Sequence, residues 1–219
     1  MFIIGQDSKM EPKVQIVCIT YNHEKYIAEA LNSFIKQKTN FNFEVLVGDD
    51  CSTDNTGLIV DDFVRRYPNL IKKVERDNNL GPTKNLIDLC NHCTAPYIAF
   101  CEGDDYWVDE YKLQKQFDYM EKNTDVRVCF TQVEVNYPTN WATSSWYRKI
   151  NDKIIIPNSI PGFYIKKFYR ANDLVNFFPH TSSYFFRWKY DLKIPDWFFD
   201  GYSGDIPILL LQLGTEKAA

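Results

Sequence analysis

The feature that most constrains the fold is a repeat of apolar runs and amphipathic stretches through the first 125 residues. Buried-strand patterns rich in β-branched residues cover 14–20, 43–47, 71–75 and 97–101. A polar turn follows each run, and then apolar residues recur at helical spacing, as in 24–38. Strands separated by single helices require right-handed crossovers. The sequence therefore predicts an α/β fold, a Rossmann-like and mainly parallel sheet flanked by helices.

Acidic turns follow two of the predicted strands. Asp49 and Asp50 come directly after the second strand, and Asp104 and Asp105 follow the fourth. In an open parallel sheet, ligands bind outside the carboxyl ends of the strands, where these turns meet. We therefore expect the two pairs of acids to share one crevice, although about fifty residues separate them in the chain.

The stretch Glu102-Gly103-Asp104-Asp105 is the most concentrated of these acidic turns. Carboxylates at the end of a buried strand are costly unless a cation meets them, and hard oxygen ligands suit Mg²⁺ or Mn²⁺. Neighbouring side chains of an extended chain point to opposite faces, so Asp104 and Asp105 are expected to differ in role, one holding a metal and the other accepting a hydroxyl. The alternative is a plain acidic turn.

Composition favours an ordinary globular protein. The chain has 219 residues, 45% of them hydrophobic, and a net charge of -4, which provides no basic field for nucleic acid. No apolar run is long enough for a membrane span or a signal peptide, so a cytoplasmic location is expected. Cys18, Cys101 and Cys129 lie in apolar runs and are expected to be buried. Cys90 and Cys93 lack the second ligand pair that a structural zinc site needs.

The second half of the chain has a different character. Residues 137–202 hold 19 of the 35 aromatic side chains together with several turn-forming prolines. Aromatic faces stack on sugar rings, but such residues can equally form the core of a loop-rich subregion. Further elements are predicted as a strand over 126–135, a short helix near 172–178, a strand near 182–188 and a helix over 208–213.

Four motifs in order resemble family 2 glycosyltransferases of the GT-A fold. They are the strand ending in Thr20-Tyr21-Asn22, the run Val47-Gly48-Asp49-Asp50-Cys51-Ser52-Thr53-Asp54, the turn Asn79-Leu80-Gly81-Pro82-Thr83-Lys84-Asn85, and Glu102-Gly103-Asp104-Asp105. The match covers about residues 14–125 and extends more loosely to Asp205. It implies three parts: a leader over 1–12, a half that binds a nucleotide sugar over 13–125, and an acceptor-side half over 126–219.

The resemblance also implies roles for single residues. Such enzymes bind a nucleotide-diphosphate sugar, usually a uridine one, and the segment Thr20-Tyr21-Asn22 lines the nucleotide pocket. Asp50 would accept a hydrogen bond from the base, whereas Asp49 either joins the site or, like Ser52 and Asp54, shapes the turn and caps the helix. Lys84 would lie near the diphosphate or be merely solvated. Asp104 would bind a ribose hydroxyl and Asp105 the Mn²⁺ or Mg²⁺ ion.

For the transfer step, the resemblance implies inversion at the anomeric carbon, with Asp205 as the base that deprotonates an acceptor hydroxyl. As a plain helix cap, Asp205 would look the same. His180 has either an acceptor-side role or an exposed surface position. The implied acceptor is a glycan or a lipid-linked glycan in polysaccharide biosynthesis, with peripheral contact to the inner face of the membrane. Family members continue beyond the position of Ala219, which predicts a truncated product.

Two rival functions are considered. A sugar nucleotidyltransferase would carry a glycine- and arginine-rich loop after the first strand, and the turn Thr20-Tyr21-Asn22-His23 has no glycine. A catalytically impaired nucleotide-sugar-binding module, left after loss of the carboxyl-terminal part, would bind UDP without turnover. Binding and hydrolysis assays distinguish this module from an enzyme.

Overall fold

The computed structural model describes residues 11–131, 133, 148–150, 153–155, 169–170, 180–188, 208 and 217–218. Four strands and four helices alternate first: β1 (Val14–Thr20), α1 (Ile27–Ile35), β2 (Phe43–Asp49), α2 (Thr56–Arg66), β3 (Ile71–Lys73), α3 (Pro82–Asn91), β4 (Tyr97–Phe100) and α4 (Lys112–Lys122). Further along come β5 (Val126–Cys129), β6 (Arg148–Ile150), β7 (Lys153–Ile155), β8 (Tyr169–Arg170), the 3₁₀ turn η3 (Thr181–Ser183), β9 (Phe185–Arg187) and β10 (Lys217–Ala218).

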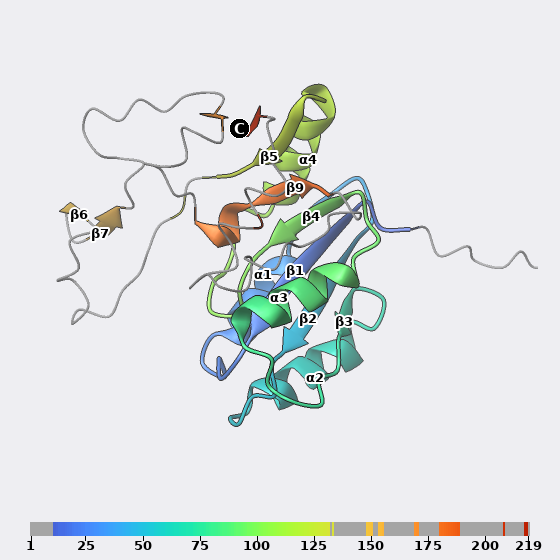
Figure 1. Cartoon of the computed structure of the whole chain (residues 1–219), viewed down its shortest axis with the longest axis vertical. Coiled ribbons are helices and arrows are strands. Elements are labelled where there is room, and N and C mark those ends of the chain that lie inside the picture. Colours follow the sequence, from blue (N-terminus) through green and yellow to red (C-terminus); the bar gives the residue numbers. More distant parts are fainter. Residues whose placement is uncertain are drawn as a thin grey trace, which may run out of the picture.

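The main sheet has the order β3-β2-β1-β4-β9-β5-β10-β8, and a hairpin of β6 and β7 stands apart from it (Figure 1). β3, β2, β1 and β4 run parallel, with β1 between β2 and β4. This order places the carboxyl ends of β1, β2 and β4 side by side. The predicted α/β fold with a mainly parallel sheet flanked by helices is confirmed.

Helices cover both faces of the sheet. Side chains of α1, α2 and α4 pack with one face of β1 in a large apolar cluster that includes Phe34, Phe63 and Leu113. The α3 helix packs on the other face, where Leu89 joins Val17 of β1 in a second cluster (Figure 1). Because residues of β1 enter both clusters, the strand is buried on both faces, which explains its mainly apolar sequence, with only Gln15 and Thr20 polar.

β8 pairs antiparallel with β10 at one edge of the sheet, and β9 is a second exception to the parallel arrangement. It pairs antiparallel with β4 through Tyr97↔Arg187 and antiparallel with β5 through Val128↔Phe186. The loop after β4 is also tied to this segment, because the Trp107 indole donates a 2.9 Å hydrogen bond to the carbonyl oxygen of Ser182. A segment some 80 residues later in the chain thus lies beside the acidic turn after β4.

Most predicted elements are found with shorter bounds. The helix predicted over 24–38 spans Ile27–Ile35, because residues 24–26 form a turn, and the strand predicted over 71–75 spans Ile71–Lys73. The strand predicted from Ser182 is wrong at its start: Ser182 and Ser183 belong to η3, and extended pairing begins at Phe185. Ile208 is helical, but the rest of the helix predicted over 208–213 and the one near 172–178 lie outside the described residues.

The predicted burial of cysteines is confirmed. Cys18, Cys101 and Cys129 are buried, and burial raises the pKa of each of these thiols. None of the helices in the described residues is long and apolar enough to cross a membrane.

Candidate functional site

A pocket of about 400 Å³ lies where β1, β2 and β4 end. It collects residues from the turns after these strands and from the start of α3, namely Ile19, Thr20, Tyr21, His23, Asp50, Asn79, Gly81, Pro82, Asn85, Glu102 and Asp104. Both acidic turns predicted to share a crevice therefore contribute to it, through Asp50 and Asp104. Its volume is within the range of pockets that hold small organic ligands.

One end of the pocket is acidic. β4 stops at Phe100, and the chain then turns, with Gly103 N–H donating to the Ile19 carbonyl at 2.9 Å. As a result, Glu102, Asp104 and Asp105 each bring a carboxylate oxygen into one group whose members lie within 4.8 Å of one another. We call these three residues the acidic cluster. Their geometry suits a divalent cation with hard oxygen ligands.

Gly103 is the residue that permits this turn. A Cβ atom built at this position would lie 2.5 Å from Thr20 Oγ1 and 2.7 Å from Thr20 Cβ. Contacts this short are sterically excluded, so only glycine brings the acidic cluster this close to β1.

The two aspartates of the cluster have different neighbours. His23 Nε2 lies 3.9 Å from Asp104 Oδ2, and His180 Nδ1 lies 3.7 Å from Asp105 Oδ2. Burial raises the pKa of Asp105, and the nearby charge of Asp104 adds to this rise, although His180 opposes it. Charge is therefore crowded at this end of the pocket, and a bound cation would relieve the crowding.

Strict alternation of neighbouring side chains does not describe this turn. Asp104 and Asp105 do contact different segments, yet their oxygens converge, because residues 101–105 are no longer extended strand. Sequence reasoning left Glu102 out of the site. The signal that could have found it is the glycine at position 103, since a tight turn brings the residue before it alongside the residues after it.

The opposite end of the pocket is built around Asp50, which is only 2% exposed. Its Oδ1 accepts the backbone N–H of Leu80 at 2.7 Å, and its Oδ2 accepts that of Gly81 at 2.8 Å. Asn79 Nδ2 donates to the Asp50 carbonyl at 2.9 Å. Asp50 therefore fixes the 79–81 turn that leads into α3, and each carboxylate oxygen keeps capacity for a further hydrogen bond.

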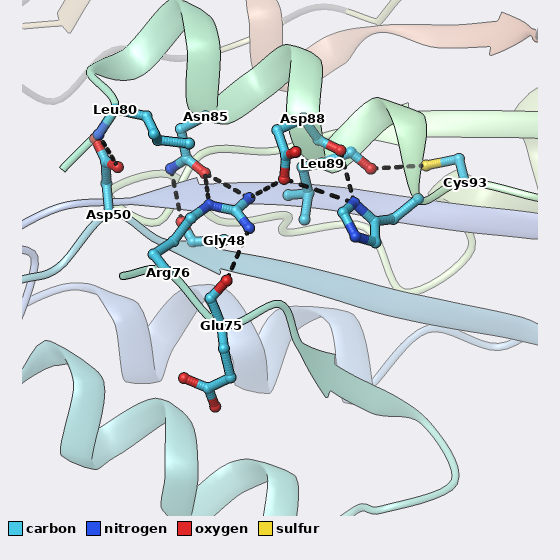
Figure 2. Close-up of polar contacts among 10 residues, drawn as sticks. Gly48, Asp50, Glu75, Arg76, Leu80, Asn85, Asp88, Leu89 and Cys93 are labelled. Atoms are coloured by element: carbon cyan, nitrogen blue, oxygen red, sulfur yellow. Dashed lines mark hydrogen bonds and ion pairs between the residues drawn. The ribbon is translucent and has the colours of Figure 1, made fainter. Parts of the chain in front are cut away.

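Below this turn lies a buried polar network (Figure 2). Asn85 Nδ2 donates to the Gly48 carbonyl at 2.8 Å, and Asn85 Oδ1 accepts from Arg76 Nη2 at 3.0 Å and Nε at 3.3 Å. Arg76 Nη2 also lies 2.9 Å from Asp88 Oδ2. The Arg76 side chain is 5% exposed. The network joins α3 to β2 and to the segment after β3.

The remaining predicted residues of the first two turns divide into two groups. Thr20 and Tyr21 line the pocket, and Tyr21 is 43% exposed. Asn22 and Asp49 are not among its lining residues. Asn22 Oδ1 accepts the Thr53 N–H at 2.8 Å, and the Asp49 carboxylate accepts a hydrogen bond from the Ser52 hydroxyl.

These contacts fasten the loop after β1 to the loop after β2. Asn22 N–H donates to Ser52 Oγ at 2.9 Å, and Glu24 N–H donates to Asp54 Oδ2 at 3.1 Å. Asp54 Oδ1 also accepts the Thr56 N–H at 2.9 Å where α2 begins. The interpretation of Ser52 and Asp54 as residues that shape the turn is confirmed, and Asp54 also bonds the first residue of α2, whereas the N-cap position itself is Asn55.

Lys84, Asp205 and His180 are the remaining residues predicted to belong to the site. Lys84 is exposed on the first turn of α3 and is not among the pocket-lining residues. Asp205 lies outside the described residues. His180 is half-buried rather than a fully exposed histidine, with Nδ1 2.9 Å from Ser182 Oγ and near Asp105.

Comparison with known proteins gives consistent matches. The family model described as "Glycosyl transferase family 2" matches residues 15–192. An uncharacterised protein of Mycobacterium tuberculosis is 40% identical over 153 residues, which are 67% of this chain and 44% of the relative. A poly(ribitol-phosphate) beta-N-acetylglucosaminyltransferase, TarS, of Staphylococcus aureus is 39% identical over 97 residues, 43% of this chain and 16% of that enzyme.

A solved structure of residues 1–349 of S. aureus TarS in complex with UDP shares the fold, with a TM-score of 0.58 and 22% identity over 94% of this chain and 60% of that one. The chain spans less than half the length of the curated relatives just named. With a family model matching most of its length, four ordered motifs and a GT-A sheet, the chain belongs to glycosyltransferase family 2.

Proposed function

We propose that this chain carries the donor-binding part of an inverting glycosyltransferase. It moves a sugar from a nucleoside diphosphate donor, a UDP-sugar in the first instance, to a hydroxyl of a glycan or lipid-linked acceptor. The observation that carries the proposal is the pocket itself: one cavity combines an aromatic face at Tyr21 and a buried acid at Asp50 with an acidic cluster at the other end.

The two ends of the pocket suit the two parts of such a donor. A divalent cation held by the acidic cluster attracts a diphosphate, whereas Tyr21 and Asp50 offer a stacking surface and a hydrogen-bond acceptor to a nucleoside. Asp104 belongs to the acidic cluster and lines the pocket, which supports its assignment as the acceptor for a ribose hydroxyl. In this orientation the diphosphate and the sugar lie towards the acidic cluster and η3.

The acidic cluster fits a metal by the chemistry of its donors. Glu102, Asp104 and Asp105 supply oxygen ligands that converge within 4.8 Å, and the raised pKa of Asp105 reflects burial and repulsion that a cation relieves. Mn²⁺ or Mg²⁺ bound there supplies charge stabilisation to the leaving diphosphate. Asp105 is the residue we assign to the ion, with Glu102 as a further ligand.

In the transfer step, Asp205 takes the proton of the acceptor hydroxyl. The acceptor oxygen then forms a bond to the anomeric carbon on the face opposite the leaving group, and the bond from that carbon to the phosphate oxygen breaks. The nucleoside diphosphate leaves with the electron pair of the broken bond. This displacement inverts the anomeric centre.

The setting of the reaction follows from the same proposal. Transfer to a glycan or lipid-linked acceptor belongs to polysaccharide biosynthesis, and such acceptors place the enzyme in the cytoplasm or at the inner face of the membrane. TarS, by its name, is a beta-N-acetylglucosaminyltransferase that acts on poly(ribitol-phosphate). This likeness supports a polymeric acceptor for the present chain.

Two measurements on the purified chain test the proposal. Isothermal titration with UDP in the presence and absence of MnCl₂ should show Mn²⁺-dependent binding. A coupled assay for UDP release from common UDP-sugars should then show hydrolysis, or transfer once an acceptor is supplied. An Asp205→Asn variant should bind UDP like the parent and lose transfer by about 1,000-fold, the loss expected for removal of a general base.

The outcomes separate the rival functions. Binding without turnover across the common donors supports a nucleotide-sugar-binding module instead of an enzyme. Absence of binding to any nucleoside diphosphate refutes the donor-site assignment. Transfer that survives Asp205→Asn removes Asp205 from the mechanism and leaves the donor site intact.

A further inference from the structure

Asn85 is the one side-chain amide that both lines the pocket and belongs to the buried network below it, within the part of the chain that the structure describes. It is 1% exposed, and it comes from the first turns of α3. An amide carries one acceptor oxygen and two N–H donors, so which atom faces the ligand decides what the pocket recognises.

Arg76 decides the orientation of this amide. Its guanidinium offers only donors, and two of them, Nε and Nη2, point at Asn85 Oδ1 (Figure 2). The reversed amide would set its NH₂ group against the guanidinium and its oxygen against the Gly48 carbonyl, which pairs donor with donor and acceptor with acceptor. The observed orientation of the Asn85 amide is therefore the only one in which Arg76 and the Gly48 carbonyl both keep their hydrogen bonds.

Gly48 allows the network to form so close to the sheet. A Cβ atom at this position would lie 2.6 Å from Asn85 Oδ1 and 3.2 Å from Arg76 Nη2. The Asp88 carboxylate, 2.9 Å from Arg76 Nη2, holds the guanidinium from the other side. Asn85 Nδ2 uses one hydrogen on Gly48, and no protein acceptor within the described residues takes the other. A donor is thus left for the pocket.

Gly81 connects Asn85 to Asp50 through backbone hydrogen bonds. Gly81 donates its N–H to Asp50 Oδ2 at 2.8 Å, and its carbonyl accepts the backbone N–H of Asn85 at 2.9 Å. The same end of the pocket therefore offers a fixed N–H donor from Asn85 and a fixed acceptor from Asp50. A base that presents a carbonyl beside a ring N–H satisfies both, as uracil, thymine and guanine do.

We propose that Arg76 is a positioning residue for base recognition, which orients the Asn85 amide to donate to a ring carbonyl of the donor nucleotide. Together with Asp50, the oriented amide selects bases with a carbonyl next to a ring N–H. Cytosine and adenine present an amino group beside a bare ring nitrogen. Their amino donor would face the Asn85 N–H donor, and their ring-nitrogen acceptor would face the Asp50 carboxylate. This inference rests on the proposed function, since it requires a nucleotide in this pocket.

The test is a set of binding titrations with UDP and with CDP, both in MnCl₂, on the whole chain. The parent should bind UDP at least about tenfold more tightly than CDP, because a mismatched buried pair leaves both groups unsatisfied. Arg76→Met should weaken UDP binding by about tenfold and leave CDP binding within about twofold, so that selectivity disappears.

Matched variants distinguish positioning from stability. Arg76→Lys keeps the charge but not the paired donors, and it should retain part of the selectivity. Asn85→Ser removes the amide and leaves the Arg76–Asp88 pair, and it should lose selectivity like Arg76→Met. Phe63→Leu, a core change on α2 outside the pocket lining, should lower the midpoint of urea unfolding and preserve the UDP-to-CDP ratio.

Three results would overturn the inference. They are a parent that binds CDP as tightly as UDP, selectivity unchanged in both Arg76→Met and Asn85→Ser, or the same loss of selectivity in Phe63→Leu. If Arg76→Met does not fold, Arg76→Lys and Asn85→Ser decide the question. A parent that binds no nucleoside diphosphate refutes the proposed function as well, whereas parental binding with any of the three results refutes this inference alone.

Discussion

The two ends of the pocket are built on opposite principles. At the end formed by Asp50 and Asn85, the described polar groups are held by partners within the protein, and Asp50 alone accepts two backbone N–H groups. At the acidic cluster, three carboxylate oxygens lie within 4.8 Å of one another, and His23 and His180 lie 3.9 Å from Asp104 and 3.7 Å from Asp105.

This difference indicates what each end needs from a ligand. The Asp50 end is preorganised, so a nucleoside docks against groups whose positions are already fixed. At the acidic cluster, burial and the charge of Asp104 raise the pKa of Asp105, so a bound cation would stabilise its carboxylate. Under the proposed function, the Asp50 end recognises hydrogen-bonding groups of the nucleoside, and the acidic cluster holds the cation that attracts the diphosphate. Four predictions, from the largest effect to the smallest, test this division.

The largest effect is expected from Asp105→Asn. Removing one charged ligand from the acidic cluster should weaken Mn²⁺-dependent UDP binding by about 100-fold, because an amide is a poor substitute for a carboxylate on a hard cation. Titration calorimetry with UDP and MnCl₂ measures the loss.

The control for this change is Asp118→Asn. Asp118 lies on α4, and its Oδ1 accepts a hydrogen bond from Gln114 in an exposed pair. It should bind UDP and Mn²⁺ as the parent does. An Asp105→Asn variant that binds as tightly as this control would show that the acidic cluster does not hold the metal.

The second effect concerns the turn that brings the acids together. Gly103→Ala places a methyl group against Thr20, and the strain should reduce the free energy of unfolding by about 2 kcal/mol, measured by urea denaturation. Thr20→Ala in the same chain removes the Oγ1 atom from this contact and should recover part of the loss. An alanine variant with parental stability and parental Mn²⁺ affinity would contradict the steric argument.

Glu102→Gln should have a smaller effect than Asp105→Asn. If Glu102 is a further ligand, its change should weaken Mn²⁺ affinity by about tenfold, which electron paramagnetic resonance of free Mn²⁺ can measure. The affinity for UDP in the absence of Mn²⁺ should be less affected. Equal loss of UDP binding with and without Mn²⁺ would instead place Glu102 in nucleotide recognition.

The smallest effect is expected from Lys112, a buried amine whose contacts lie outside the acidic cluster. Lys112 is buried, with Nζ 2.7 Å from Gln116 Oε1 and 4.2 Å from the centre of the Trp107 ring. Burial lowers the pKa of Lys112 from 10.5 to about 8. Lys112→Met should therefore raise the free energy of unfolding at pH 7 by about 1 kcal/mol and leave Mn²⁺ affinity unchanged.

The sign of the pH dependence follows from the lowered pKa of Lys112. Between pH 8 and 10.5 the unfolded chain holds a proton on this amine that the folded protein has released, so the stability of the parent rises with pH in this window. The advantage of Lys112→Met should therefore shrink from pH 8 upwards in urea unfolding. A difference between the two proteins that is constant from pH 7 to 10 would contradict the assignment.

Much of the fold could be predicted from the sequence because local and global signals agree in the first half of the chain. β1 is buried on both faces and its sequence is mainly apolar, while α1 shows a clear helical stripe. The turns at Asp50 and Asp104 could be placed at one edge of the sheet by topology alone. Such agreement between levels is typical of foldable sequences.

The sequence could not predict contacts made by tight turns and distant segments. Glu102 joins the acidic cluster only because the chain bends at Gly103, and Asn22 turns towards Thr53 rather than into the pocket. Arg76 and Asn85 were not singled out, since pairing across the end of β2 depends on three-dimensional packing. The positions of β9 and η3 beside β4 likewise depend on long-range pairing.

The placement of β9 has a consequence for synthesis of the chain on the ribosome. β4 pairs with β1 on one side as soon as both strands have emerged, but its other edge receives Phe185–Arg187 only after roughly 85 further residues have been added. Until then the nascent chain presents an apolar, unpaired strand edge, the feature that promotes aggregation in folding intermediates. Chaperone binding during translation should therefore concentrate in the interval between the emergence of β4 and that of β9.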